Sequence, residues 1–267
     1  MVEQQEIYKY LWSAHASDGD LDNSLSPRSS DLLFDVVAGL GIDRTWSVLD
    51  VGCGRGNHAC ELASRFQCEV KGLEPVESNL QLCRESAIEW NVSDQVEFVQ
   101  GTIEAIPFGS SHFDLLWCRD MLVHVQNLKL GLQECQRVLR PSGMMLILTT
   151  FATDLMEPQE KHRLCQALGL ASNNLSPIFM EQTFLEGGFR VVSADWLGSE
   201  LAEFYEERDG RYSRELRRIA RMTRKKKQLE AQMGQSNFEV SLALYNWGIY
   251  QLLGKLGLMV YTLKKAE

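Results

Sequence analysis

The segment Val48–Gly56, which reads VLDVGCGRG, constrains the fold of this chain more than any other part of the sequence. A short apolar run through Asp50 leads into glycines at alternate positions, Gly52, Gly54 and Gly56. Glycine lets a backbone turn sharply and lets a ligand approach without obstruction by a Cβ atom. The segment therefore predicts a buried strand, a tight turn that faces a polar ligand, and a following helix whose first N–H groups are free.

Short apolar runs alternate with amphipathic stretches over residues 46–150, a pattern typical of βαβ units around a parallel sheet. The fold we expect is α/β, with a mostly parallel, seven-stranded Rossmann-like sheet, helices on both faces and a helical lid. The expected strands are Ser47–Val51, Glu69–Glu74, Val96–Gln100, Phe113–Cys118, Met144–Thr150, Arg190–Trp196 and one near Met259–Leu263.

Two of the expected helices have clear boundaries. The first spans about Glu77–Trp90 and offers Leu80 and Ile88 as core candidates. The second spans Leu130–Leu139 and should stop at Pro141–Gly143, because proline and glycine interrupt helices.

The spacing of the glycines discriminates between nucleotide ligands. The dinucleotide fingerprint requires a third glycine where this chain has Asn57, which disfavours a nicotinamide cofactor. Glu74 ends the second expected strand and is placed to accept hydrogen bonds from both ribose hydroxyls of an adenosine, while its charge would repel a 2′-phosphate. The alternative is a tight turn without a ligand and a solvated acid in a loop.

These residues resemble the class I (Rossmann-like) S-adenosylmethionine-dependent methyltransferases, and the resemblance covers roughly residues 46–197. It continues in QGTIE (Gln100–Glu104), IPF (Ile106–Phe108), FDLLWCRDMLVHV (Phe113–Val125), RVLRPSG (Arg137–Gly143) and GGF (Gly187–Phe189).

The resemblance implies S-adenosylmethionine as the cofactor, with S-adenosylhomocysteine as its product. The family often has Asp where this chain has Thr102, so the adenine N6 contact must come from a hydroxyl, a backbone carbonyl or water. By position, the resemblance assigns Gly52, Gly54 and Gly56, in one segment with Asp50 and Cys53, to the methionine portion, Glu74 to the ribose, Thr102 and Ile103 to the adenine, and Cys118 and Arg119 to the amino-acid end.

Methyl transfer from a sulfonium mainly requires a nucleophile held in line with the S–CH₃ bond. An acceptor that carries a proton also requires a base, and His124, shortly after the fourth expected strand, is the first candidate. Asp120 is the second, as a base or as an orienter of a cationic substrate. The alternative for His124 is a histidine that packs a helix. His58 and His112 are expected to be solvated.

Two regions outside the βαβ pattern are lid candidates, since substrate specificity in the family usually lies in such additions. Trp12 and His15 in the first region either cover the acceptor or belong to an ordinary surface helix. The predicted division is an N-terminal lid segment over 1–40, a cofactor-binding core over 41–197, a helical cap over 198–254 and a final core strand over 255–267.

The cap segment combines an acidic and a basic stretch. Glu200, Glu203 and Glu207 form an acidic stripe, and a basic helix over 211–227 follows. The basic helix is interpreted as an outward-facing helix balanced by the acidic stripe, with an anion site as the alternative. A further helix, Phe238–Leu253, is expected to fasten the lid with its aromatic residues or to line a pocket.

Composition limits the partners. The net charge of −9 disfavours nucleic acid and anionic membranes, so any polyanion site must be local. Seven scattered cysteines without a Cys-x-x-Cys spacing predict buried thiols in a reduced compartment, and no metal site. The N-terminus lacks a secretion signal and no apolar stretch is long enough to span a membrane, so a cytoplasmic location is expected.

The predicted function is methyl transfer from S-adenosylmethionine to an oxygen, nitrogen or activated carbon of a small-molecule metabolite. Two alternatives stay open: an RNA or protein methyltransferase that uses the basic helix, and a cofactor-binding protein without catalysis. The sequence identifies neither the acceptor nor the oligomeric state.

Overall fold

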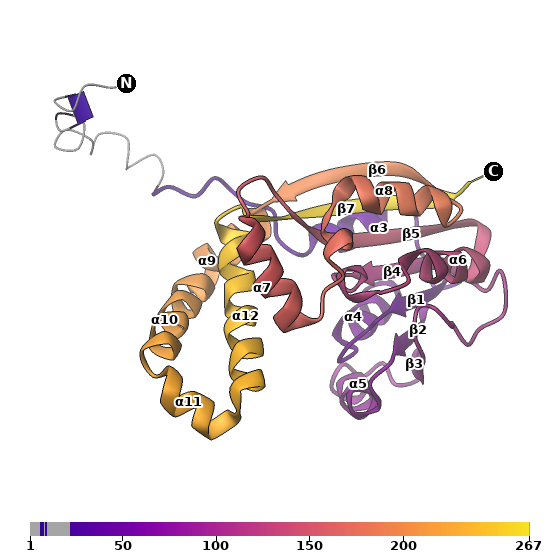
Figure 1. Ribbon diagram of the computed structural model, residues 1–267. Coiled ribbons are helices and arrows are strands. Elements are labelled where there is room, and N and C mark those ends of the chain that lie inside the picture. The colour runs from indigo at the N-terminus through magenta and orange to yellow at the C-terminus, as the bar shows by residue number, and fades with distance from the viewer. Residues whose placement is uncertain (1–5, 8, 10–21, 267) are drawn as a thin grey trace.

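The computed structural model describes residues 6–7, 9 and 22–266 (Figure 1). Trp12 and His15, expected either to cover the acceptor or to belong to an ordinary surface helix, fall outside the described residues. The described elements, in chain order, are α3 (Leu32–Gly39), β1 (Ser47–Val51), α4 (Asn57–Phe66), β2 (Glu69–Glu74), α5 (Glu77–Glu89), β3 (Val96–Gln100), β4 (Phe113–Arg119), η1 (Leu122–His124), α6 (Leu128–Val138), β5 (Leu139–Ala152), α7 (Pro158–Leu168), η2 (Ser172–Leu175), α8 (Pro177–Glu186), β6 (Phe189–Gly198), α9 (Glu200–Asp209), α10 (Arg211–Arg224), α11 (Lys226–Met233), α12 (Gln235–Leu252) and β7 (Leu256–Lys265).

The sheet has seven strands in the order β3-β2-β1-β4-β5-β7-β6. The five strands β3, β2, β1, β4 and β5 are parallel to one another, and β7 is antiparallel to both β5 and β6. The predicted mostly parallel α/β sheet is therefore confirmed. The strand order reverses between β1 and β4, and ligands of open α/β sheets bind outside the carboxyl ends of the strands at such a reversal.

Alternate side chains of each central strand enter two different cores, which is why these strands are apolar almost throughout. On β4, Leu115 and Trp117 pack with residues of α3 and α4 on one face of the sheet. Leu116 and Cys118 pack with residues of α6 and α8 on the other face. Helices cover both faces, as predicted, and both cores extend to the strand ends that carry the candidate site.

Part of the predicted N-terminal lid contributes to the core instead. Leu33, Phe34 and Val37 of α3 are buried, and the Phe34 ring centroid lies 5.1 Å from that of Trp117. This helix covers the sheet, and a lid role stays a prediction only for the rest of the segment 1–40.

Two local predictions are wrong. The predicted helix does stop before Pro141–Gly143, since α6 ends at Val138, but the following strand begins at Leu139 and not at the predicted Met144. The β4–β5 register shifts there: Phe113 pairs with Leu139, but Leu115 pairs with Met144. A strand tolerates proline at such an irregularity. Ile88 is 70% exposed, since α5 turns other side chains toward the sheet.

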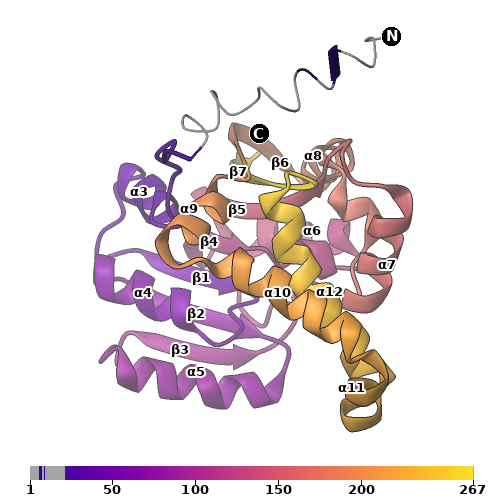
Figure 2. The same ribbon diagram turned by 90° about the vertical axis from the view of Figure 1, so that its left-hand side faces the viewer.

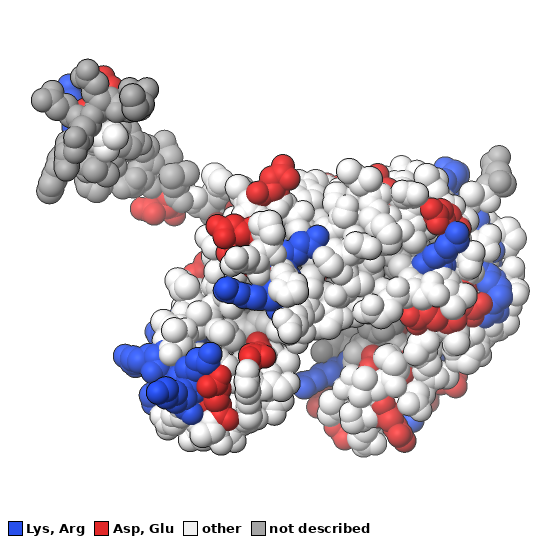
Figure 3. Space-filling view, viewed as in Figure 1, with Lys and Arg blue, Asp and Glu red and all other residues white. Residues whose placement is uncertain are grey.

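Helices α9 to α12, together with α7, gather at one end of the sheet (Figures 1 and 2). That end is the carboxyl edge of the parallel strands, because β6 is parallel to β5 and runs into α9. In Figure 2, α10 and α12 cross in front of the sheet. Figure 3 shows the surface hollowed between these helices and the part of the core that carries α4 and α5. The segment 198–254 thus lies at the carboxyl edge of the sheet, and its role as a cap stays a prediction.

The seven cysteines are all buried and free of disulfide bonds, as predicted. Among the described residues, no group of three or more His, Cys, Asp or Glu side chains is arranged to hold a metal ion. None of the described helices combines the length and the apolar character that crossing a bilayer requires.

Candidate functional site

The glycine loop connects β1 to α4 and makes the tight turn that the sequence predicts. Gly52 and Gly54 have φ angles of +73° and +58°, in the left-handed region that favours glycine. A Cβ atom on Gly52 would lie 3.0 Å from the side chain of Met121, whereas a Cβ atom on Gly54 would meet nothing within 4 Å. The loop is therefore covered by Met121 at one end and faces open space at Gly54.

Several N–H groups of the loop itself, ahead of the helix whose first N–H groups were expected to be free, are engaged within the protein. Gly52 and Cys53 donate to the Leu73 carbonyl at 2.9 and 3.0 Å, and the Gly54 N–H donates to the Glu74 carboxylate at 2.9 Å. A pyrophosphate is bound by such donors when they point at the ligand. The loop is consequently a poor phosphate site, which agrees with the disfavoured dinucleotide cofactor.

Glu74 is not a solvated loop acid, because it is 5% exposed and accepts three hydrogen bonds. Besides the Gly54 N–H, the N–H of Val76 donates to it at 3.1 Å and the Asn79 side chain at 2.9 Å. A carboxylate offers about four acceptor sites. Glu74 therefore fixes the glycine loop and retains capacity for a ligand hydroxyl.

Asp50, Arg119 and His58 form a polar cluster where β1 and β4 end, in which Asp50 is buried and the other two are half-buried. Asp50 is 3% exposed, and burial raises the pKa of its carboxyl to about 7, although the nearby Arg119 and the Ala59 N–H act in the opposite direction. Arg119 Nη1 lies 2.5 Å from His58 Nε2. Burial and the Arg119 charge lower the pKa of His58 to about 4. The prediction that His58 is solvated is wrong.

Two atoms of this cluster are buried without a hydrogen-bond partner among the described residues: Asp50 Oδ2 and Arg119 Nε. Buried polar atoms are nearly always paired in folded proteins, so both call for partners from a ligand or solvent. One is a carboxylate oxygen and the other a guanidinium donor. That combination fits the ammonium and carboxylate groups of an amino acid, which is the end that S-adenosylmethionine carries.

The remaining predicted cofactor residues differ in what their side chains can reach. Cys118 is buried in the core, and burial raises the pKa of its thiol well above the usual range. Ile103 is also buried, with its side chain 3.1 Å from a Cβ atom built on Gly131. Cys53 lies buried under the loop. These three residues can meet a ligand through backbone atoms, whereas Thr102 is exposed and keeps its hydroxyl available.

Asp120 follows β4 directly and is held in an unusual conformation. Its φ angle is +52°, its N–H donates to the Leu148 carbonyl at 2.7 Å, and its Oδ1 accepts from the Thr150 hydroxyl at 2.8 Å. Burial raises the pKa of the carboxyl, while the Thr150 hydrogen bond, Arg119 and His124 lower it. His124 ends η1 with an exposed side chain. The structure thus fixes Asp120 firmly and leaves His124 at the surface.

Asn174 is a site-supporting residue that sequence reasoning missed. It is buried in η2, and its Nδ2 donates to the carbonyls of Leu122 and Val125 at 2.7 and 2.8 Å. These bonds fix the turn that carries His124. The partners are about 50 residues apart in sequence, so no local pattern signals this role.

The basic helix predicted over 211–227 is two helices, α10 and α11, and its cations face outward. Figure 3 shows them as a blue patch over the part of the lid labelled α10 and α11 in Figure 1. Arg214 pairs with Asp209 at 2.9 Å and Lys226 with Glu230 at 3.6 Å. The exposed cations without an ion pair to a described residue are Arg217, Arg218, Arg221, Arg224, Lys225 and Lys227. They form the basic face of the lid.

The acidic stripe of α9 does not balance this basic face. Glu200 pairs with Arg28 at 2.7 Å, and Glu207 accepts a hydrogen bond from the Ser24 hydroxyl at 2.6 Å. The interpretation as an outward-facing helix is confirmed, but the predicted neutralisation is wrong, because the stripe turns toward the segment before α3.

The strand order, the antiparallel β7 and a glycine loop at the β1/β4 reversal define the class I methyltransferase fold. Residues 49–147 match the family described as a methyltransferase domain. The match covers less than half of the chain, and the matched segment holds the glycine loop, Glu74 and Arg119.

Several named proteins are similar to the chain. A sarcosine/dimethylglycine N-methyltransferase of Halorhodospira halochloris is 29% identical over 171 residues, which cover 64% of this chain and 60% of that protein. A sterol 24-C-methyltransferase of Saccharomyces cerevisiae is 33% identical over 124 residues, 46% of this chain and 32% of that protein. The chain therefore spans less than two thirds of either relative. The crystal structure of the [4+2]-cyclase SpnF superposes with a TM-score of 0.70 at 18% identity, covering 92% of this chain and 85% of that one.

Proposed function

We propose that this protein transfers the methyl group of S-adenosylmethionine to a small molecule. The observation that carries the proposal is the pair of unpartnered buried atoms, Asp50 Oδ2 and Arg119 Nε, at the strand reversal. Beside them lies a glycine loop that is open at Gly54 yet has its donors engaged. This arrangement suits an amino-acid end better than a pyrophosphate, and the family match supports it. When bound, the cofactor supplies a methyl group activated toward nucleophiles.

The cofactor residues receive distinct roles in this proposal. Asp50 would accept from the ammonium group and Arg119 would donate to the carboxylate of the methionine portion. The fourth acceptor site of Glu74 would take a ribose hydroxyl. Backbone atoms of Ile103 and the hydroxyl or backbone of Thr102 would meet the adenine. The remaining contacts would come from the backbone of Gly52, Cys53, Gly54, Gly56 and Cys118.

Asp120 takes the first place as the candidate group for the acceptor proton. Thr150 holds one of its carboxylate oxygens at 2.8 Å, which leaves the other free to orient an acceptor or take its proton. His124 becomes the second candidate, because its side chain is exposed. Met121, which lies against Gly52, would shield the reaction from water.

The acceptor proposed is a small molecule methylated on oxygen, nitrogen or an activated carbon. The relatives carry the names of an N- and a C-methyltransferase, so the similarity alone does not select the atom. We also propose a cytoplasmic location, supported by seven buried thiols that form no disulfide.

The basic face of the lid favours a second candidate, an RNA or protein methyltransferase. Six exposed cations without a described ion-pair partner are more than an ordinary solvated helix needs. This candidate predicts nucleic acid binding that weakens steeply with salt. Fluorescence anisotropy with a short RNA at low ionic strength tests it, and an absence of binding would remove the RNA branch.

Calorimetry and a transfer assay test the main proposal together. We expect S-adenosylhomocysteine to bind to the wild-type protein. Glu74→Gln should lower its affinity at least about tenfold through loss of a charge-assisted hydrogen bond. The control variant Glu77→Gln, at an exposed residue nearby, should leave the affinity unchanged. Radiolabelled S-adenosylmethionine and a panel of metabolites should yield a labelled small molecule. Tight binding with no product from any acceptor would contradict catalysis and favour a binding protein.

A further inference from the structure

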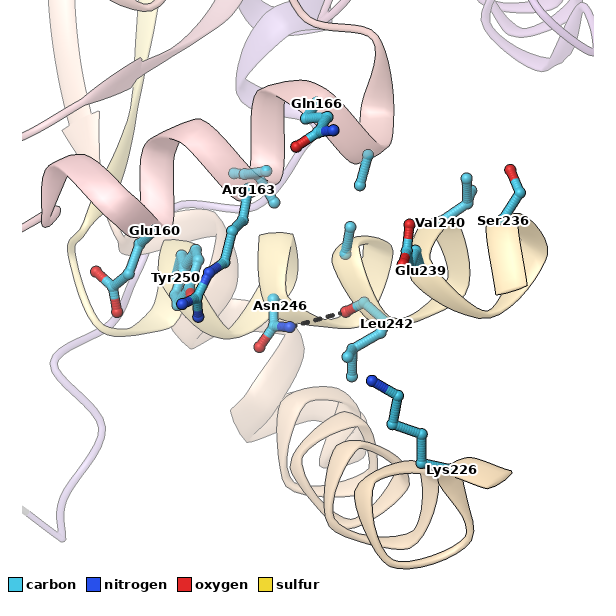
Figure 4. Close-up of a pocket in the computed structure, with 13 residues that line it drawn as sticks. Glu160, Arg163, Gln166, Lys226, Ser236, Glu239, Val240, Leu242, Asn246 and Tyr250 are labelled. Carbon is cyan, nitrogen blue, oxygen red and sulfur yellow. Dashed lines mark hydrogen bonds between the residues drawn. The ribbon is translucent and has the colours of Figure 1, made fainter. Parts of the chain in front are cut away.

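A cavity of about 600 Å³ lies between α7 and α12, beneath the start of α11 (Figure 4). Small-molecule sites in proteins usually occupy about 300–1,000 Å³. None of the predicted cofactor or catalytic residues lines this cavity. It is therefore a separate groove in the lid that nothing described above uses.

The floor of the groove is apolar and is joined to the candidate site. Leu164, Ala167 and Ala243 line the floor. Leu164 and Ala243 share a hydrophobic cluster with Val123, the residue before His124. The groove is thus built on the same packed cluster as the turn that follows β4.

One end of the groove carries a cation that makes no hydrogen bond or ion pair with a described residue. Glu160 lies there, but both of its carboxylate oxygens accept from Lys255, at 2.6 and 2.7 Å. Arg163 has no hydrogen bond or ion pair with a described residue. Its side chain extends from α7 toward α12, with the guanidinium beside Tyr250 (Figure 4). Glu160 and Lys255 pair with each other, and Glu157 also acts on Lys255 and Tyr250, so Arg163 is a cation at this end without a paired acid among the described residues.

The direction of α7 relates the cation to the candidate site. The Ala171 N–H, just beyond the end of α7, donates to the Val123 carbonyl at 2.8 Å, so this end of the helix lies at η1. Arg163 stands five residues before Leu168, the last residue of α7, a distance of about 7–8 Å along the helix axis. A ligand whose anionic end is held at Arg163 would extend along the apolar floor toward η1.

We infer that this groove holds the methyl acceptor, and that the acceptor is an amphipathic anion with one carboxylate or phosphate at the end of an apolar body. The inference rests on the proposed methyltransferase function. The anionic group binds at Arg163, with the Tyr250 hydroxyl as a further donor, and the apolar body lies on Leu164 and Ala243. The methylated atom is then at the end of the molecule remote from the anion.

Binding of decanoate to the full-length protein, measured by calorimetry with S-adenosylhomocysteine present, tests the groove directly. Decanoate should bind at least about tenfold more tightly than decanol, which has the same chain and no charge. Arg163→Gln should abolish that preference, whereas Arg217→Gln on the basic face of the lid should preserve it. Equal binding of the two ligands, or a preference that survives Arg163→Gln, would overturn the inference.

A second measurement links the groove to catalysis and separates it from the proposed function. Arg163→Gln should raise KM at least about tenfold for anionic acceptors and leave kcat nearly unchanged, because the residue holds the acceptor far from the methyl group. An unchanged KM would refute the acceptor role. Failure of the proposed function would appear differently, as a wild-type protein that binds decanoate but neither binds S-adenosylhomocysteine nor turns over.

Discussion

Replacing Arg119 with glutamine isolates the recognition of the amino-acid end of the cofactor. Arg119 Nε is buried without a described partner and stands in a cluster with Asp50. A hydrogen bond to a charged group contributes about 1.5–3 kcal/mol. Each tenfold change in affinity corresponds to about 1.4 kcal/mol, so Arg119→Gln should lower the affinity for a ligand that carries a carboxylate by about 10- to 150-fold.

The assay compares two ligands on the same protein by calorimetry. S-adenosylhomocysteine carries the amino-acid end, and 5′-methylthioadenosine lacks it. Arg119→Gln should weaken the first by the factor above and leave the second nearly unchanged, because the adenosine contacts lie at Glu74 and Thr102. Arg55→Gln, an exposed change in the same loop, serves as the control.

The pattern of losses decides whether the reasoning holds. If both ligands weaken equally in Arg119→Gln, the side chain supports the loop in general and does not bind the carboxylate. If neither ligand weakens, Arg119 does not contact the cofactor at all, and the orphaned donor has another purpose.

Three further predictions concern pH, a turn and the loop. Folding raises the pKa of Asp50 to about 7, so the contribution of this group to the stability of the fold is greatest below about pH 4 and is lost as the pH rises toward 7. In urea unfolding, Asp50→Asn should therefore gain stability relative to wild type as the pH rises over that range. The pKa of His58 is lowered by folding, so its contribution to the stability of the fold is lost as the pH falls from 6.5 toward 4. Relative to wild type, His58→Gln should therefore gain stability as the pH falls, which is the opposite of the trend for Asp50→Asn. Parallel stability curves for the two variants would contradict these pKa shifts. Asn174→Ala should cost about 2–4 kcal/mol of unfolding free energy by removing two buried hydrogen bonds. The same variant should lower turnover more than cofactor affinity. A loss of less than about 1 kcal/mol, or an unchanged turnover, would show that the turn at His124 does not depend on Asn174. Gly54→Ala and Gly41→Ala both place a Cβ atom at positive φ in open space, so each should destabilise the fold by about 1–2 kcal/mol. Only Gly54→Ala should also weaken the binding of S-adenosylhomocysteine in calorimetry. Equal affinities of the two variants would exclude the loop from the site.

The core and the loop were predictable because their signals are local. The strand from Val48, the alternating glycines and Glu74 lie within about 30 residues of one another. The structure confirms the predicted seven-stranded sheet, and Gly54 has a positive φ in the predicted tight turn.

The errors arose where distant residues determine the environment. His58 is half-buried and lies beside Arg119, which is 61 residues away in sequence and ends β4. The acidic stripe of α9 does not meet the basic helix, since Arg28, 172 residues earlier, binds Glu200. Strand β5 begins at Leu139 and not at Met144, because Leu139 already pairs with Phe113 of β4, which a local pattern cannot show.

Hydrogen–deuterium exchange in the presence and absence of S-adenosylhomocysteine measures where the methyl donor binds. We expect added protection in the glycine loop, residues 52–57, and in the segment 119–124 after β4, because a ligand there would cover both and order the turn. Protection confined to α7 and α12, or no protection at saturating ligand, would contradict a donor site at the ends of β1 and β4.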